Sequence, residues 1–345
     1  MKLRQTYCFD DVLLVPAKSD IKSREEVDIT SKIGSTEFRI PIISSPMDTV
    51  TECEMMCAMA KLGGLGVLHR YNSVVHQASV FADARMRLEE EGNSYSSKLA
   101  VAIGSSEDFE KRARLLVENG VRVLCLDVAH GHHTMAESAI KKLKDTFADN
   151  VLVMAGNIAT PEAYHDLSAW GADAVRIGIG GGSICSTRIQ TGHGMPTFQS
   201  VLDCAAIDGA TIIADGGIRT AGDIVKALAA GADFVMLGSM LAGTDETPGE
   251  VLSGTDDRKY KVYRGMASVE AQMDWRGKAR SLEGISTTIP HRGNVSAIIE
   301  NLERNIKSGL SYSGARSISQ LQAKSNFIHQ THAGQLESST HILKR

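Results

Sequence analysis

The sequence of 345 residues has no apolar run approaching the roughly 20 residues that a membrane-spanning helix needs. Its first residues, Met-Lys-Leu-Arg-Gln-Thr-Tyr, lack the apolar segment of a secretory signal. The formal net charge is −4 at pH 7, so the chain lacks the basic excess of nucleic-acid-binding domains. We therefore expect a cytoplasmic protein with neither a membrane nor a nucleic acid as partner.

Paired cysteine spacings typical of zinc sites are also missing among the six cysteines. Cys53 and Cys57 lie four residues apart in a predicted helix, and we interpret them as core residues. His130, His132 and His133 cluster in a predicted loop, where two adjacent histidines rarely chelate one ion. The composition favours a reducing compartment and no transition-metal centre.

Short apolar runs recur along the chain, each followed by turn residues and then by apolar residues at helical spacing. Strands of this kind that alternate with helices indicate a parallel sheet covered by helices. Eight units over about 200 residues favour a closed (β/α)8 barrel of α/β class. An open doubly wound sheet is the alternative, but its Gly-x-Gly-x-x-Gly opening is absent. The eight predicted strands are Ile40–Ser45, Leu65–His69, Leu99–Gly104, Val121–Val128, Val151–Gly156, Ala174–Gly180, Thr211–Asp215 and Phe234–Gly238.

The expected domain organisation is one catalytic barrel over residues 1–328 with an N-terminal extension. Residues 253–292 have weak periodicity, and we predict a mobile active-site segment there. Residues 329–345 are polar, and we expect a partly disordered tail.

A glycine-rich run ending in a thiol is the most informative local pattern. Four of the five residues from 178 to 182 are glycine, and Ser183, Cys185 and Thr187 follow. Glycines allow close approach of the backbone to a ligand, and a thiol can act as a nucleophile. The pattern predicts covalent chemistry on an anionic substrate. A structural cysteine after a glycine-rich turn is the alternative.

Other polar residues follow the predicted strands at the same end. In a barrel these ends form one rim, where the catalytic groups gather and phosphate often binds after strands seven and eight. We therefore predict one site at this rim. The residues concerned are Ser45, Pro46, Met47, Asp48, His69, Arg70, Asp127, Asn157, Asp215, Gly216, Gly217, Gly238 and Ser239.

Six ordered motifs resemble the inosine-monophosphate dehydrogenase / guanosine-monophosphate reductase family along nearly the whole chain. They are Phe9–Pro16, Ser44–Val50, Gly180–Thr187, Ile213–Gly217, Phe234–Ser239 and Tyr263–Met266. The resemblance implies a (β/α)8 barrel that forms a homotetramer and acts on a purine nucleoside monophosphate.

Within the family, the sequence is more similar to the reductases. Residues 72–98 leave no room for the regulatory cystathionine-β-synthase-type module of dehydrogenases. The Arg-Tyr pair that activates water in dehydrogenases is absent between Ala267 and Glu283. The expected reaction is thus NADPH-dependent conversion of GMP to IMP and ammonia. NAD-dependent IMP dehydrogenation stays open, because Ser239 and Arg264 resemble the dehydrogenases and some dehydrogenases lack the module.

The resemblance implies roles for individual residues. Cys185 would add to purine C2 as a thiolate, and Thr187 with Glu283 would move the proton that ammonia needs to depart. Ala267 and Leu282 depart from the reductase pattern near the purine, so contact with the 2-amino group is in question. The implied substrate-binding residues are Ser45, Met47, Ser183, Asp215, Gly216, Gly217, Gly238, Ser239, Tyr263, Gly265, Met266 and Arg280.

The cofactor side follows from the same resemblance. Gly104, Ser105, Asp127 and Asn157 occupy rim positions where the family binds its dinucleotide. The carbonyls of Gly180, Gly182 and Cys185 would bind a monovalent cation such as K⁺. We expect no flavin. A flavin-dependent barrel oxidoreductase and a catalytically silent nucleotide-binding barrel are the rival classes.

Overall fold

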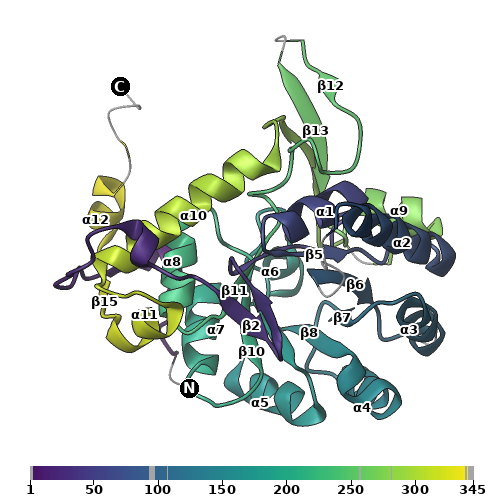
Figure 1. Ribbon diagram of the computed structural model, residues 1–345, viewed down its shortest axis with the longest axis horizontal. Helices are drawn as coiled ribbons and strands as arrows, with labels where there is room; N and C mark the ends of the chain where they lie inside the picture. Colours follow the sequence, from purple (N-terminus) through teal and green to yellow (C-terminus); the bar gives the residue numbers. More distant parts are fainter. Residues whose placement is uncertain are drawn as a thin grey trace.

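The structure is a computed structural model that describes residues 3–92, 98–106, 108–255, 258–280, 282–338 and 340. Its centre is a closed barrel of eight parallel strands, which confirms the predicted (β/α)8 architecture (Figure 1). The hydrogen-bonded order around the barrel is β10-β11-β4-β5-β6-β7-β8-β9. The strands are β4 (Ile42–Ser44), β5 (Leu65–Leu68), β6 (Leu99–Ile103), β7 (Val123–Asp127), β8 (Leu152–Ile158), β9 (Ala174–Ile177), β10 (Thr211–Asp215) and β11 (Phe234–Leu237).

Helices surround the barrel (Figure 1). Their ends follow capping rules: in α5 the Thr160 side chain accepts a hydrogen bond from the Ala163 N–H, and Gly171 ends the helix with φ +107°. The surrounding helices are α1 (Cys53–Lys61), α2 (Val74–Glu90), α3 (Phe109–Glu118), α4 (Thr134–Phe147), α5 (Pro161–Trp170), α6 (Thr187–Thr191), α7 (Thr197–Cys204), α8 (Ala221–Ala229) and α10 (Val295–Tyr312).

The core has two layers, because successive residues of a strand point to opposite faces. In β6, Ala100 and Ala102 belong to the cluster inside the barrel, whereas Leu99, Val101 and Ile103 pack outward against the helices. Burial of each large apolar side chain stabilises the fold by about 1.5–3 kcal/mol.

A hairpin closes the amino-terminal end of the barrel. It consists of β2 (Ser31–Ile33) and β3 (Thr36–Phe38), which pair antiparallel. The Phe38 ring meets Phe234 edge to face, with ring centroids 5.6 Å apart. Because apolar side chains fill this end, we expect the catalytic site at the carboxyl-terminal end of the strands.

The predicted active-site segment 253–292 contains regular structure. Strands β12 (Leu252–Ser253), β13 (Lys259–Arg264) and β14 (Ser286–Pro290) form an antiparallel sheet that projects from the barrel, and α9 (Val269–Arg276) lies between β13 and β14 along the chain (Figure 1).

Segments near the two ends of the chain pair outside the barrel. Strand β1 (Val12–Leu14) pairs with β15 (Phe327–His329), so the predicted boundary at residue 328 falls inside a strand. Helices α11 (Ile318–Lys324) and α12 (His332–Glu337) flank it, and η1 (Phe9–Asp11) and η2 (Arg24–Glu26) are single 3-10 turns. Residues 332–337 of the polar tail are thus helical, and residues 341–345 lie outside the described part.

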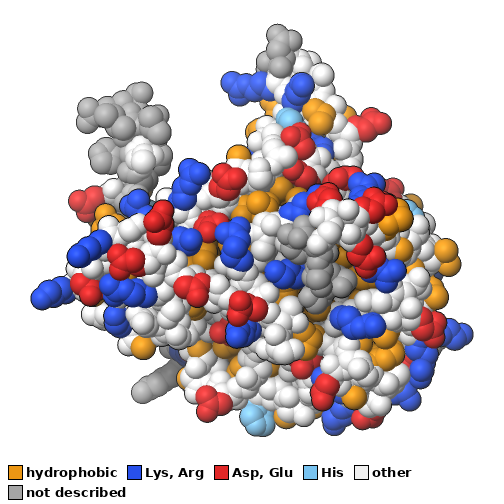
Figure 2. Space-filling model, in the orientation of Figure 1, with side chains coloured by type: hydrophobic (Ala, Val, Ile, Leu, Met, Phe, Trp, Pro, Cys, Tyr) orange, Lys and Arg blue, Asp and Glu red, His pale blue; other side chains and the backbone are white. Residues whose placement is uncertain are grey.

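No helix among the described residues is long and apolar enough to cross a membrane. Figure 2 shows Lys and Arg side chains interspersed with Asp and Glu side chains over the face in view.

Candidate active site

A cavity of about 310 Å³ lies at the carboxyl-terminal ends of the barrel strands. Most of the residues that the sequence points to line it together. They are Ser45, Met47, Asp127, Asn157, Gly180, Gly182, Ser183, Cys185, Thr187, Asp215, Gly216, Gly217, Gly238, Ser239, Tyr263, Gly265, Met266 and Glu283.

Cys185, Thr187 and Glu283 form a hydrogen-bonded row in the cavity wall. The Cys185 thiol donates to Thr187 Oγ1 at 3.2 Å, and the Thr187 hydroxyl donates to Glu283 Oε2 at 2.8 Å. The row depends on backbone pairing, since Cys185 bridges Gly284 and the Ser186 N–H donates to the Glu283 carbonyl at 3.0 Å. A proton can therefore pass between the sulfur and the carboxylate through one hydroxyl.

A buried arginine, which our sequence reasoning missed, joins two predicted carboxylates. Arg176 is 5% exposed. Its Nη1 donates to Asp127 Oδ1 at 2.7 Å, and its Nη2 donates to Asp215 Oδ2 at 2.9 Å. Asn157 Nδ2 donates to the same Asp215 oxygen at 2.8 Å. The available signal was a charged residue within the apolar strand Ala-Val-Arg-Ile, because a buried charge needs partners.

Electrostatics keep Asp127 ionised despite its burial. Burial by itself would raise the pKa of Asp127, but the nearby charges of Arg176 and Arg70 outweigh it and lower that pKa. Burial likewise acts to lower the pKa of Arg176, while Cys125, Asp215 and Asp127 raise it well above its ordinary value. Arg176 and Asp127 thus form a charged pair at neutral pH.

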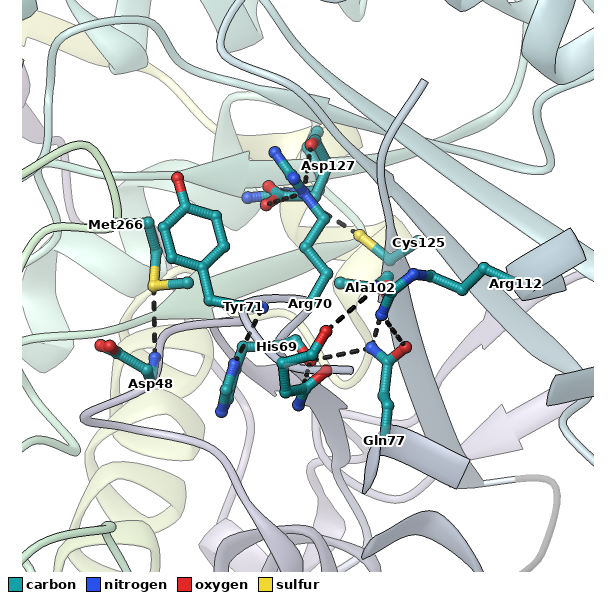
Figure 3. Close-up of polar contacts among 12 residues, drawn as sticks. Asp48, His69, Arg70, Tyr71, Gln77, Ala102, Arg112, Cys125, Asp127 and Met266 are labelled. Carbon is teal, nitrogen blue, oxygen red and sulfur yellow. Dashed lines mark hydrogen bonds and ion pairs between the residues drawn. The ribbon is translucent and has the colours of Figure 1, made fainter. Parts of the chain in front are cut away.

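Arg70 and Tyr71 line the cavity beside Asp127 (Figure 3). The sequence analysis predicted Arg70 at the rim but did not predict Tyr71. Arg70 Nε donates to the Asp127 carbonyl at 3.1 Å. The Tyr71 ring stacks on Trp275 of α9 with centroids 4.1 Å apart, and the Arg70 guanidinium lies 5.6 Å from the Trp275 ring centroid. Helix α9 is therefore docked next to the cavity by aromatic contact.

Gln77 of α2 anchors the loop that carries Arg70 and Tyr71 by hydrogen bonds (Figure 3). Gln77 Nε2 donates to the carbonyls of His69 and Ala102, both at 2.8 Å, and Arg112 Nη1 donates to Gln77 Oε1 at 2.9 Å. His69 Nδ1 accepts the Tyr71 N–H at 3.2 Å, so Nε2 carries the proton that faces Glu52 at 3.0 Å. His69 thus has a structural role.

Ser183, Gly238, Ser239 and Tyr263 converge on another side of the cavity. The Tyr263 hydroxyl lies 3.5 Å from Ser183 Oγ, and burial raises the pKa of Tyr263. A Cβ at Gly238 would lie 2.9 Å from Ser45 Oγ and 3.2 Å from the Tyr263 hydroxyl, so a side chain there would fill the recess. Hydroxyl groups around an open glycine backbone suit an anionic ligand.

Arg264 fastens the loop after β4 to the end of β13. Its Nη2 donates to Asp48 Oδ2 at 2.7 Å, and its Nη1 donates to Asp274 Oδ2 at 2.6 Å. The Asp48 N–H lies 3.3 Å from the Met266 sulfur, which places Met266 at the cavity wall (Figure 3).

Five predicted site residues lie outside the cavity lining, namely Asp48 and His69, whose contacts are given above, and Gly104, Ser105 and Arg280. Gly104 and Ser105 follow β6, and Gly104 lies behind Arg70, since a Cβ there would be 3.3 Å from Arg70 Nη1. Arg280 is exposed, and its backbone N–H donates to Gln272 Oε1 at 2.9 Å. Their binding roles stay predictions.

The histidines after β7 do not form a metal centre in the described part of the chain. His132 Nε2 pairs with Asp166 Oδ2 at 2.9 Å. No group of three or more His, Cys, Asp or Glu side chains that could hold a metal occurs among the described residues.

A family model described as the IMP dehydrogenase / GMP reductase domain matches residues 6–341. The chain belongs to this family. The match covers the barrel, the projecting sheet and every residue of the site described above. The chain is accordingly an oxidoreductase of the IMP dehydrogenase / GMP reductase family, whose members use a nicotinamide cofactor.

Relatives with both activities are similar to the chain. It is 37% identical to an inosine-5′-monophosphate dehydrogenase of Cryptosporidium parvum, covering 96% of this chain and 94% of that protein. It is 33% identical to one of Nitrosopumilus maritimus, covering 99% of each. A GMP reductase of Leishmania donovani is 31% identical over 98% of this chain and 97% of its own length. The last two alignments span 473 and 477 positions, so these relatives carry segments that this family member lacks.

A solved structure shares the fold over the whole chain. It is a cysteine-to-alanine variant of GMP reductase from Trypanosoma brucei in complex with guanosine 5′-monophosphate, with a TM-score of 0.91 and 31% identity. The superposition covers 98% of each chain.

Proposed function

We propose that the chain catalyses the NADPH-dependent reductive deamination of GMP to IMP and ammonia. The observation that carries the proposal is the Cys185–Thr187–Glu283 row, with both contacts at hydrogen-bonding distance. It supplies a nucleophile and a proton relay in one cavity wall. The absence of an Arg-Tyr pair between residues 267 and 283 agrees with a reaction that expels an amine rather than activates water.

The proposed sequence of events begins at sulfur. The Cys185 thiol loses its proton through the Thr187 hydroxyl to Glu283, and the thiolate adds to C2 of the purine. Glu283 then returns this proton through Thr187 to the 2-amino group, which leaves as ammonia. A thioimidate between Cys185 and C2 remains. The nicotinamide, when bound, supplies the hydride that C2 needs, and the thiolate departs as IMP forms.

The nucleotide would be oriented by groups on two sides of Cys185. Asp215 is the proposed partner of the ribose hydroxyls, because a carboxylate accepts several hydrogen bonds. Ser183, Gly217, Gly238, Ser239 and Tyr263 are the proposed phosphate contacts, and Ser45, Met47, Gly216, Gly265 and Met266 would flank the base and ribose. The cavity lining supports each of these roles.

Asp127 and Asn157 are the proposed dinucleotide contacts, since both line the same cavity. The neighbouring Arg70 and the flat Tyr71–Trp275 stack have the chemistry to accept phosphate oxygens and a planar ring. These residues therefore fit a nicotinamide dinucleotide. NADPH, rather than NADH, is part of the proposal.

The carbonyls of Gly180, Gly182 and Cys185 are the proposed ligands of K⁺. Their fit rests on the donor set, because carbonyl oxygens are hard ligands. The loop turns tightly, with Gly180 at φ +78° and the Cys185 N–H bonded to the Gly182 carbonyl at 3.1 Å. A homotetramer in the cytoplasm remains our prediction; sedimentation equilibrium would measure the assembly.

A spectrophotometric assay tests the proposal. Protein mixed with GMP and NADPH should lose absorbance at 340 nm and release one ammonia for each NADPH oxidised. NAD⁺ reduction by IMP, with no turnover of GMP, would instead establish the dehydrogenase. That second candidate is favoured by the 37% identity to the Cryptosporidium parvum enzyme.

A further inference from the structure

Lys261 is a buried cation that the proposed mechanism does not use. It is 3% exposed and lies on the inner face of β13. Its Nζ donates to the carbonyls of Thr244, Asp245 and Thr247, at 3.0, 3.3 and 2.6 Å. A lysine ammonium has three N–H donors, and each has an acceptor here. The side chain is thus satisfied as a cation without a carboxylate in direct contact.

The three carbonyls belong to the turn that follows β11. This turn begins at Gly238, whose carbonyl accepts the N–H groups of Leu241 and Ala242 at 3.0 and 2.9 Å. Gly238 and Ser239 of the recess and the three carbonyls that bind Lys261 therefore belong to one turn. Backbone hydrogen bonds therefore connect Gly238 to the part of the turn that holds the three carbonyls.

The strand that carries Lys261 also carries a wall of the recess. Tyr263 lies two residues further on, and residues two apart in a strand share a face. Lys261 and Tyr263 are both buried, whereas Val262 between them is exposed. The ammonium therefore fastens β13 to the turn after β11 close to the place where Tyr263 meets Ser183 and Gly238.

Other bonds join the turn after β11 to residues 291 and 292, which follow β14 and do not belong to β13. Arg292 Nη1 donates to the Ser239 carbonyl at 2.9 Å, and His291 Nε2 pairs with Asp245 Oδ1 at 2.7 Å; both contacts are exposed. Exposed ionic contacts are screened by salt and by water, whereas a buried ammonium among carbonyls is not. Lys261 is thus the buried contact between β13 and this turn.

We propose that Lys261 is a positioning residue that acts as a built-in monovalent cation, collecting three carbonyls so that Tyr263 and Gly238 enclose the substrate phosphate. The phosphate part rests on the proposed function. The ammonium takes the place that a bound potassium or ammonium ion takes in a carbonyl cage, but it is covalently tied to the strand that it fixes.

Lys261→Met tests the proposal, since it keeps the length of the side chain and removes the donors. Lys259→Met is the matched control, because Lys259 lies on the same strand with an exposed side chain. We expect Lys261→Met to raise the KM and the Kd for GMP and IMP by about tenfold or more, with kcat changed by less than about threefold. Amide hydrogen exchange of residues 241–247 should accelerate in the unliganded variant. Lys259→Met should match the wild type in KM, Kd, kcat and the rate of amide exchange.

Lys261→Ala provides a chemical rescue that a purely structural role would not show. The deletion removes three carbons and the ammonium, and n-propylammonium restores the same atoms. We expect this ion to recover the affinity for GMP and the slow exchange, whereas tetramethylammonium, which has no N–H donor, should recover neither. The rescue experiment with Lys261→Ala also tests the proposal if Lys261→Met folds poorly.

Wild-type affinity and exchange in Lys261→Met would overturn the proposal. So would a loss in Lys261→Ala that n-propylammonium does not reverse, or a fall in kcat as large as the rise in KM. Failure of the proposed nucleotide site has a different signature, namely a wild-type protein that binds neither GMP nor IMP. In that case the exchange data for the unliganded variants decide the role of Lys261.

Discussion

The amino-terminal end of the barrel is filled with apolar side chains, whereas the carboxyl-terminal end encloses buried charges. Ile33, Phe38 and Phe234 pack at the first end. At the second end Arg176 lies between Asp127 and Asp215, and the thiol of Cys185 faces the cavity. The same strands therefore have one end that contributes mainly stability and another where stability depends on complete charge pairing.

The two ends of the barrel therefore tolerate different substitutions. At the apolar end a truncation leaves a cavity, and its cost follows the volume lost. At the charged end the loss of one partner leaves an unpaired buried charge, which costs more than the pair itself contributes. The following predictions test this contrast, from the largest expected effect to the smallest.

Cys185→Ala should abolish turnover while GMP still binds, because the phosphate and ribose contacts remain. Steady-state kinetics and calorimetric titration measure the two quantities. Cys204→Ala is the control, since Cys204 is buried in α7 away from the cavity. Residual activity above about one per cent would contradict covalent catalysis.

Glu283→Gln should slow ammonia release by about 10²–10⁴-fold, because glutamine keeps the size of the side chain but cannot hold the proton. Single-turnover measurements separate ammonia release from hydride transfer, which should be affected less. An equal loss in both steps would disprove the relay role of Glu283.

Arg176→Met should lower the free energy of unfolding by about 3–5 kcal/mol at pH 7, because it removes the buried cation that bridges the half-buried carboxylates of Asp127 and Asp215. The pKa of Asp127 is lowered in the folded wild type, so the pairing stabilises the protein above the ordinary aspartate pKa of about 3.9 and is lost as the pH falls through the folded value.

The difference between Arg176→Met and wild type should therefore shrink as the pH falls, since the variant can protonate the carboxylates. Urea unfolding at several pH values measures it. A constant difference between pH 7 and pH 4 would show that packing, rather than charge, is what Arg176 contributes.

Phe38→Ala should cost about 3 kcal/mol of stability, because it empties space against Phe234. The KM for GMP and the kcat should stay at wild-type values below the melting temperature. Thermal unfolding and the 340 nm assay check both expectations, and Phe38→Leu should lose less stability. A changed KM would show that the two ends of the barrel are coupled.

Local pattern was enough to predict much of this arrangement. Each barrel strand appears as a short apolar run, and every run except Leu99–Gly104 is followed by turn residues that line the cavity. The predicted run Thr211–Asp215 matches β10 residue for residue, and Ala174–Gly180 contains β9. The prediction was possible because the burial of a strand and the conformation of a turn depend on residues that are adjacent in the sequence.

The segment 253–292 was harder to predict. Its strand β13 pairs with β14 across an intervening helix, and its burial alternates over only six residues. Such a short pattern is ambiguous until the partner strand is known. Arg176 was missed for a related reason, since its two carboxylates lie 49 and 39 residues away along the chain.

The sequence by itself determined the α/β alternation, the glycine-rich loop and the thiol, because these depend on residues close together in the chain. Only the tertiary structure decided that Glu283 reaches Thr187 across 96 residues, that Arg176 bridges two carboxylates, and that Lys261 meets three carbonyls. Contacts of that kind depend on barrel closure and on the pairing of distant segments, which no local pattern specifies.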